Sequence, residues 1–150
     1  MARQAAVTSS HVVALENSFD EVEAIYQRNI DNVPEGQKGQ LKNAWQDLSA
    51  LKQQLDTDKP KKLLASSGQV EEMYWQARGA YKTLRPVAAE LIEKGKISGS
   101  DAATLKAIDR RAKELDQQLK GLTDNERVNA VLQFTRDVVP VLGRVIVALV

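Results

Sequence analysis

The sequence predicts an all-α protein, an antiparallel up-and-down bundle of about five helices in a single domain spanning residues 1–150. Apolar residues recur at steps of three and four along almost the whole chain, and no segment alternates as a half-buried strand does. The connections around Pro34, Gly99 and Gly121 are short, so consecutive helices are expected to lie antiparallel and side by side. The apolar stripes favour shallow, coiled-coil-like crossings of about 20°.

The first two helices are predicted at about Ser10–Ile30 and Gln37–Leu55, after an N-terminal arm of residues 1–9. Ser9 or Ser10 is the expected N-cap of the first helix. Its apolar stripe comprises Val12, Leu15, Phe19, Val22 and Tyr26, and an acidic, solvated face carries Glu16, Asp20, Glu21 and Glu23. The stripe of the second helix comprises Leu41, Ala44, Leu48, Leu51 and Leu55, with Trp45 beside it. Residues 56–66 form the longest internal loop, since Pro60 disfavours helix at the residue before it.

The third and fourth helices are predicted at about Ser67–Lys94 and Asp101–Lys120. The third has an apolar stripe of Val70, Tyr74, Ala77, Tyr81, Leu84, Ala88 and Leu91. Pro86 lies inside this helix, so we expect a kink there, and Gly95 is the natural residue just after its end. The stripe of the fourth helix comprises Leu105, Ile108, Ala112, Leu115 and Leu119.

The fifth helix is predicted from Thr123 to the end of the sequence, where Thr123 and Glu126 form a capping box and Pro140 introduces a second kink. One apolar stripe comprises Val128, Leu132, Thr135, Val139, Leu142, Ile146 and Leu149. A second comprises Val131, Phe134, Val138, Val141 and Val145. A helix that is apolar on most sides is buried on most sides. This helix is therefore either the central helix of the monomer or an interface helix.

We expect it to be an interface helix, because a monomer that exposed the second stripe would show a larger apolar patch than soluble proteins tolerate. The candidate interaction residues are Val131, Phe134, Val138, Val141, Leu142, Val145, Ile146 and Leu149, with Trp75 as a further candidate. Trp75 stands beside the stripe of the third helix, where partial exposure is expected, and exposed tryptophan is enriched at protein interfaces.

Helices two and three resemble helices four and five, which indicates two related helical hairpins. The pentads at 51–55 and 115–119 both read Leu-x-Gln-Gln-Leu, and each following helix has Pro-Val near its middle, at Pro86 and Pro140. Leucines at heptad spacing also align by chance, so duplication and coincidence both stay open.

The composition offers little for catalysis. The chain has no cysteine and one histidine, His11, which excludes thiolate zinc sites and a di-iron site built on two Glu-x-x-His pairs. It contains no phosphate-binding loop. The net charge of +1 argues against a polyanion-binding protein. We therefore predict no catalytic residue, no cofactor and no metal site.

The sequence thus predicts a non-enzymatic structural or assembly protein, acting as a homo-oligomer or by docking into a larger complex such as a virion or secretion apparatus. One alternative is a membrane-associated protein that uses its apolar C-terminal helix. Against it, the apolar run falls short of the roughly 20 residues of a membrane span, and Arg144 interrupts it. A second alternative is a nucleic-acid accessory protein using the basic residues Lys59, Lys61 and Lys62. The N-terminus lacks a signal-peptide pattern, so we expect a soluble, cytoplasmic protein, or one within a cytoplasmically assembled particle.

Overall fold

The computed structural model describes residues 2–57 and 67–150, and these residues form an all-α bundle without strands, as predicted. The α-helices are α1 (Ala2–Asn29), α2 (Glu35–Thr57), α4 (Ser67–Glu93), α5 (Gly99–Gln118) and α6 (Asp124–Leu149). Two short 3-10 helices, η1 (Ile30–Asn32) and η2 (Leu119–Gly121), follow α1 and α5. The predicted loop at 56–66 lies almost wholly outside the described residues.

Two of the predicted helix ends are confirmed in detail. At the start of α6, the Thr123 hydroxyl accepts from the backbone N–H of Glu126, and the Glu126 carboxylate accepts from the backbone N–H of Thr123. At the end of α4, Gly95 has φ 71°, the left-handed conformation that glycine tolerates best. The N–H groups of Gly95 and Lys96 close this end on the carbonyls of Ile92 and Leu91.

The predicted N-terminal arm and its cap were wrong. The backbone of α1 is helical from Ala2, so Ser9 and Ser10 lie inside the helix and residues 2–9 extend it. Residues 2–6 contain three alanines, a glutamine and an arginine, all strong helix formers, and no glycine or proline precedes Ser10. A serine can cap the start of a helix, but it does not prevent strong helix formers before it from extending the helix toward the N-terminus.

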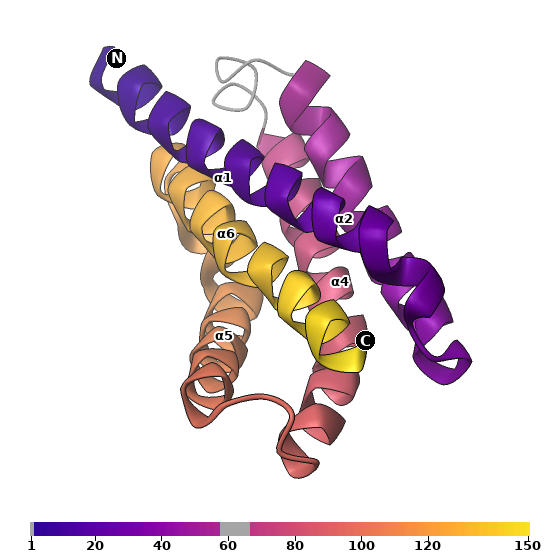
Figure 1. Ribbon diagram of the computed structural model, residues 1–150. Helices are drawn as coiled ribbons and strands as arrows, with labels where there is room; N and C mark the ends of the chain where they lie inside the picture. Colours follow the sequence, from indigo (N-terminus) through magenta and orange to yellow (C-terminus); the bar gives the residue numbers. More distant parts are fainter. Residues whose placement is uncertain (1, 58–66) are drawn as a thin grey trace.

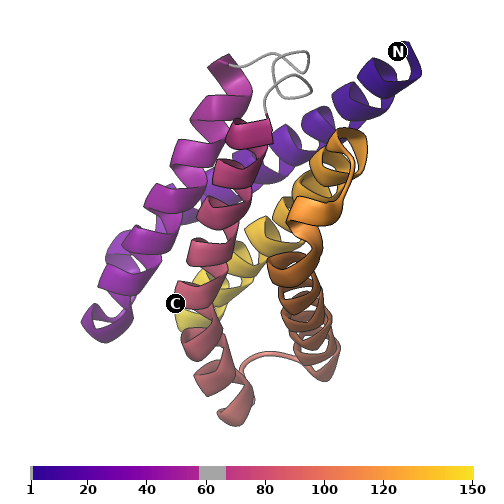
Figure 2. The same cartoon turned by 180° about the vertical axis from the view of Figure 1, so that it is seen from behind.

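The fold is organised around α6, which packs most extensively against α1 and α4 (Figure 1). Both of these helices run in the same direction as α6. Consecutive helices do alternate in direction, as predicted, but among them only α2 and α4 pack closely together, and α5 stands apart from α4 in Figures 1 and 2. Consecutive helices are thus antiparallel neighbours linked by side-chain contacts, such as that of Tyr26 with Trp45, but most of these pairs are not the most closely packed ones. Short loops set the direction of a helix, whereas the two apolar stripes of α6 draw α1 and α4 against it.

The second apolar stripe of α6 lies inside the monomer. Val131, Phe134, Val138 and Val145 are fully buried, and Val141 is 5% exposed. The ring of Tyr74 on α4 packs against Phe134 with centroids 5.3 Å apart. Leu142 and Ile146 are fully buried as well, and only Leu149 of the predicted interaction residues on this helix is partly exposed. The expectation that this stripe is exposed for self-association was wrong, because α6 is the central helix.

The two prolines at which kinks are predicted lie within helices, Pro86 in α4 and Pro140 in α6, and each helix continues on both sides of its proline. The bends expected at these positions stay predictions. The proposed relation between the two hairpins also stays a prediction, although α2 and α4 pack along each other more extensively than α5 and α6 do.

Candidate functional site

A groove of about 450 Å³ lies between α1, the start of α5 and the last turns of α6. We call it the α1–α6 groove. Its apolar walls are formed by Val22, Ile25, Ile97, Pro140, Val147 and Ala148. Because it is open and mostly apolar, it suits the binding of an apolar surface rather than of a highly polar ligand.

Gly143 lines this groove at a point where α1 and α6 approach each other closely. A Cβ atom at this position would lie 3.3 Å from Ile25 Cδ1 and 3.5 Å from Val22 Cγ2. A larger side chain would therefore have to push against α1 or fill the groove. The absence of a side chain at Gly143 allows both the close approach of the helices and the depth of the groove.

Four charged side chains lie among the residues that line the α1–α6 groove, two acidic and two basic. They are Glu21, Lys96, Asp101 and Arg144. Arg144 Nη1 lies 2.6 Å from Asp101 Oδ1, an ion pair that links the end of α6 to the first turn of α5. Glu21 and Lys96 make no ion pair within the described part of the chain. Of the four charged side chains that line the groove, Asp101 and Arg144 therefore pair with each other, and Glu21 and Lys96 are available to a partner.

Large apolar side chains are exposed at two places on the described surface. Val147, which lines the groove, is 58% exposed, and Val150, directly after the end of α6, is 55% exposed. Trp75, near the start of α4, is 52% exposed, as expected from its position beside the stripe. Its ring meets Tyr74 edge-on, with centroids 5.0 Å apart. Trp75 is not part of the groove, so the two exposed apolar regions are separate candidates.

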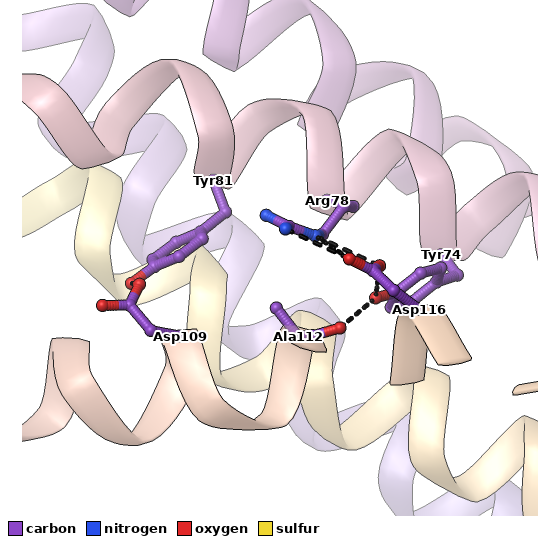
Figure 3. A network of polar contacts seen from close by, with 6 residues as sticks. All are labelled: Tyr74, Arg78, Tyr81, Asp109, Ala112 and Asp116. Carbon is purple, nitrogen blue, oxygen red and sulfur yellow. Dashed lines mark hydrogen bonds and ion pairs between the residues drawn. The ribbon is translucent and has the colours of Figure 1, made fainter. Parts of the chain in front are cut away.

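Two polar clasps join α4 and α5, each made of a tyrosine, an arginine and an aspartate. The first comprises Tyr74, Arg78 and Asp116, and the second comprises Tyr81, Arg85 and Asp109. Figure 3 shows the first clasp with its hydrogen bonds and the Tyr81–Asp109 pair of the second. Because the two clasps are seven residues apart on both helices, they repeat after two helical turns.

In each clasp the tyrosine hydroxyl is buried between two acceptors. Tyr74 Oη lies 2.5 Å from Asp116 Oδ1 and 3.0 Å from the carbonyl oxygen of Ala112. The hydroxyl has one O–H group to donate, and we assign this hydrogen bond to the Asp116 carboxylate, since hydrogen bonds to ionised acceptors are the stronger ones. Tyr81 repeats this geometry, at 2.5 Å from Asp109 Oδ1 and 2.9 Å from the Leu105 carbonyl oxygen.

The clasps shift the protonation equilibria of their members. Burial, and then the hydrogen bonds to Asp116 and Asp109, raise the pKa values of Tyr74 and Tyr81 well above the usual range. Burial also raises the pKa of Asp116, but the hydrogen bonds from Arg78 and Tyr74 outweigh it, and the net pKa is lowered. The first clasp thus favours the charged form of Asp116, and both clasps favour the neutral form of their tyrosine.

Sequence reasoning placed Tyr74 and Tyr81 on the buried stripe correctly but did not pair them with α5. A signal was present, because tyrosine, arginine and aspartate each recur at a spacing of seven: Tyr74 and Tyr81, Arg78 and Arg85, Asp109 and Asp116. That spacing places each set on one helix face. It does not say which helix lies opposite.

Nothing in the described part of the chain resembles a metal site, since no three His, Cys, Asp or Glu side chains are grouped so that they could hold an ion. None of the described helices combines the length and the apolar character that crossing a membrane requires. Comparison of the chain with protein-family models, with curated proteins and with solved structures finds no match.

Proposed function

We propose that this protein is a non-enzymatic assembly protein that associates with a second copy of itself through the α1–α6 groove. The observation that carries the proposal is Val147, an aliphatic side chain that is 58% exposed in the wall of a groove of about 450 Å³. Val150, 55% exposed, extends the apolar surface beyond the groove. Contact between copies would remove both side chains from water, which is the main source of free energy in protein association.

The charges of the groove favour a second copy as the partner. A two-fold symmetric interface sets one patch against itself, so a patch that mixes charges of both signs is complementary to its own image. The two acidic and two basic side chains of the groove satisfy this condition. A strongly acidic or basic partner would meet like charges at one half of the rim, and like-charge contacts suppress wrong partners.

This proposal keeps the self-association expected from the sequence but moves it to a different surface. The stripe that includes Val131 and Phe134 is buried in the monomer, so it is not available to a partner while the bundle is folded. Trp75, which was also a candidate, is exposed. The two surfaces that remain, at Val147 and at Trp75, can be distinguished experimentally.

Light scattering coupled to size-exclusion chromatography, run over a wide range of protein concentration, tests the proposal. We expect the wild-type mass to rise above that of the monomer and the Val147→Glu variant to remain monomeric. Trp75→Glu is the matched control, because it introduces the same charge at an equally exposed apolar side chain away from the groove. A wild-type chain that is monomeric throughout, or association lost only in Trp75→Glu, would contradict the proposal.

The same variants separate self-association from binding to a lipid surface. An exposed apolar helix end can also enter a membrane interface, although such helices usually carry a strongly basic face. In a liposome flotation assay we expect neither wild type nor Val147→Glu to float. Flotation of the wild type that is lost in Val147→Glu would assign this surface to lipid instead.

A further inference from the structure

A second groove lies between α4 and α5, on the surface that the polar clasps leave open. It has a volume of about 390 Å³. Its charged lining consists of Arg78, Arg85, Asp109 and Lys113, and its remaining walls are Pro86, Ala89 and Ala112. We call it the arginine groove. Two of its walls are alanines, and such small side chains leave room where α5 stands apart from α4 (Figure 2).

The arginines of this groove are not saturated by the clasps. Arg85 uses only its Nε group, 3.0 and 3.1 Å from the two carboxylate oxygens of Asp109. Its two Nη groups make no hydrogen bond to any described residue. A guanidinium carries five N–H donors, so four of them on Arg85 are left for another acceptor. The ion pair with Asp109 holds the guanidinium in place, which lowers the entropic cost of using those donors.

The charge of the lining is positive. Three basic side chains line it with one acidic side chain, Asp109, which pairs with Arg85. Arg78 pairs with Asp116 beside the groove, so one positive charge remains unpaired. Lys113 is exposed and makes no ion pair in the described part of the chain. An approaching carboxylate would therefore meet spare guanidinium donors and a free ammonium group, and the one acid in the groove is neutralised.

We propose that the arginine groove is a binding site for an acidic helical segment of a partner protein. Arg78 and Arg85 are seven residues apart, about 10 Å along α4. Two carboxylates spaced seven residues apart on a partner helix match that distance. The free edge of Arg85 can take one of them in a bidentate pair, the strongest arrangement that arginine offers. The exposed ring of Pro86 supplies an apolar contact beside it.

An acidic protein segment is favoured over nucleic acid by the small extent of the positive surface. The groove carries three basic residues, and the whole chain has a net charge of +1. Nucleic-acid-binding domains are typically strongly basic, with lysines and arginines clustered on one face. Nucleic acid is therefore an outcome of the test rather than the proposal.

The test is an NMR titration of the isotopically labelled full chain with a helical peptide that carries two glutamates seven residues apart. We expect the amide resonances of α4 and α5 around Arg85 and Lys113 to shift, and the shifts to shrink as salt is added. A peptide with glutamine in place of both glutamates should not bind. Equal binding of the glutamine peptide, or shifts confined to other helices, would overturn the proposal.

Three variants sharpen this test. Lys113→Gln removes an exposed charge and should weaken binding by about threefold, a typical effect for one exposed ion pair. Arg85→Lys preserves the positive charge opposite Asp109. A lysine has no second pair of N–H groups with which to bind another carboxylate, so the variant should weaken binding by roughly tenfold. Lys82→Gln is the matched control, because Lys82 is an exposed lysine of α4 that does not line the groove.

The variants also distinguish a loss of binding from a loss of folding stability. If Arg85→Lys lowers the melting temperature, Lys113→Gln still decides, since its side chain is exposed and takes no part in the clasps. Unchanged affinity in Lys113→Gln and Arg85→Lys would overturn the proposal. Tighter binding of an oligonucleotide with the same number of negative charges would also overturn it and assign the groove to nucleic acid.

Discussion

Tyr74 on α4 and Asp116 on α5 are joined by a hydrogen bond of 2.5 Å, and the pair Tyr81 and Asp109 repeats it seven residues along α4. Each aspartate also binds an arginine four residues after the tyrosine. These clasps connect two helices that lack the close packing of α6 against α1 or α4. The attachment of α5 to α4 therefore depends on long polar side chains more than the attachment of the other helices does.

Removing one hydroxyl should weaken this attachment. We expect Tyr74→Phe to lower the free energy of unfolding by about 1–2 kcal/mol, because a buried hydrogen bond to an ionised group is lost. Urea denaturation measures the change. Tyr26→Phe is the control, since the Tyr26 ring stacks on Trp45 with centroids 5.2 Å apart and its hydroxyl makes no hydrogen bond to a described residue. Equal losses in the two variants would show that the Tyr74 hydroxyl contributes nothing specific.

The clasps also predict a loss of stability at alkaline pH. The pKa values of Tyr74 and Tyr81 in the folded state lie above the ordinary value of 10.0. Each tyrosine therefore contributes stability that is fully present below about pH 10 and is lost as the pH rises through its folded-state pKa. Urea midpoints measured from pH 8 to 11 should fall at the upper end. The fall should be smaller in Tyr74→Phe/Tyr81→Phe, which lacks both titrating groups; an identical fall would contradict the prediction.

A charge in the core of α6 should unfold the protein. Leu142 is fully buried, and Leu142→Asp places an unpaired carboxylate among apolar side chains at a cost of several kcal/mol. We expect loss of cooperative thermal unfolding by circular dichroism. Gln133→Asp is the matched control on the same helix, because Gln133 is exposed and does not line the α1–α6 groove, so its variant should melt as the wild type does. A folded, cooperatively melting Leu142→Asp protein would show that this position is not in the core.

Gly143 gives a prediction about the contact between α1 and α6. Gly143→Ala gains about 1 kcal/mol of helix propensity. Its Cβ would be tight only against the flexible end of Ile25 and in ordinary contact with Val22, so we expect a small net increase in stability. Gly143→Leu should lose about 1–3 kcal/mol through overpacking. Adding Ile25→Ala should restore part of that loss. Chemical denaturation of the single and double variants tests this, and purely additive effects would show that Ile25 is not the obstacle.

The features that were predicted correctly from the sequence are those that short stretches of chain determine. The capping box at Thr123 and the turn at Gly95 require only neighbouring residues, and both are present. The stripes identified the buried face of each helix because periodicity alone defines a face.

The features that were not predicted depend on which helix faces pack against each other. The same two stripes on α6 fit a central helix and an interface helix equally well, and only the positions of α1 and α4 decide between them. Likewise, the α1–α6 groove follows from Gly143 and Pro140 lying opposite Val22 and Ile25, residues far apart in the sequence. No local pattern carries that information.

The contact of α1 with α6 has a consequence for how the chain folds during synthesis. α1 is synthesised before the other described helices, yet its main partner is α6, the last of them along the chain. The α2–α4 hairpin can form early, because its two helices are near neighbours along the chain. Until α6 emerges, the apolar side of α1, including Leu15 and Phe19, has no permanent cover. Nascent chains that stall before α6 would thus expose this surface to chaperones and to aggregation.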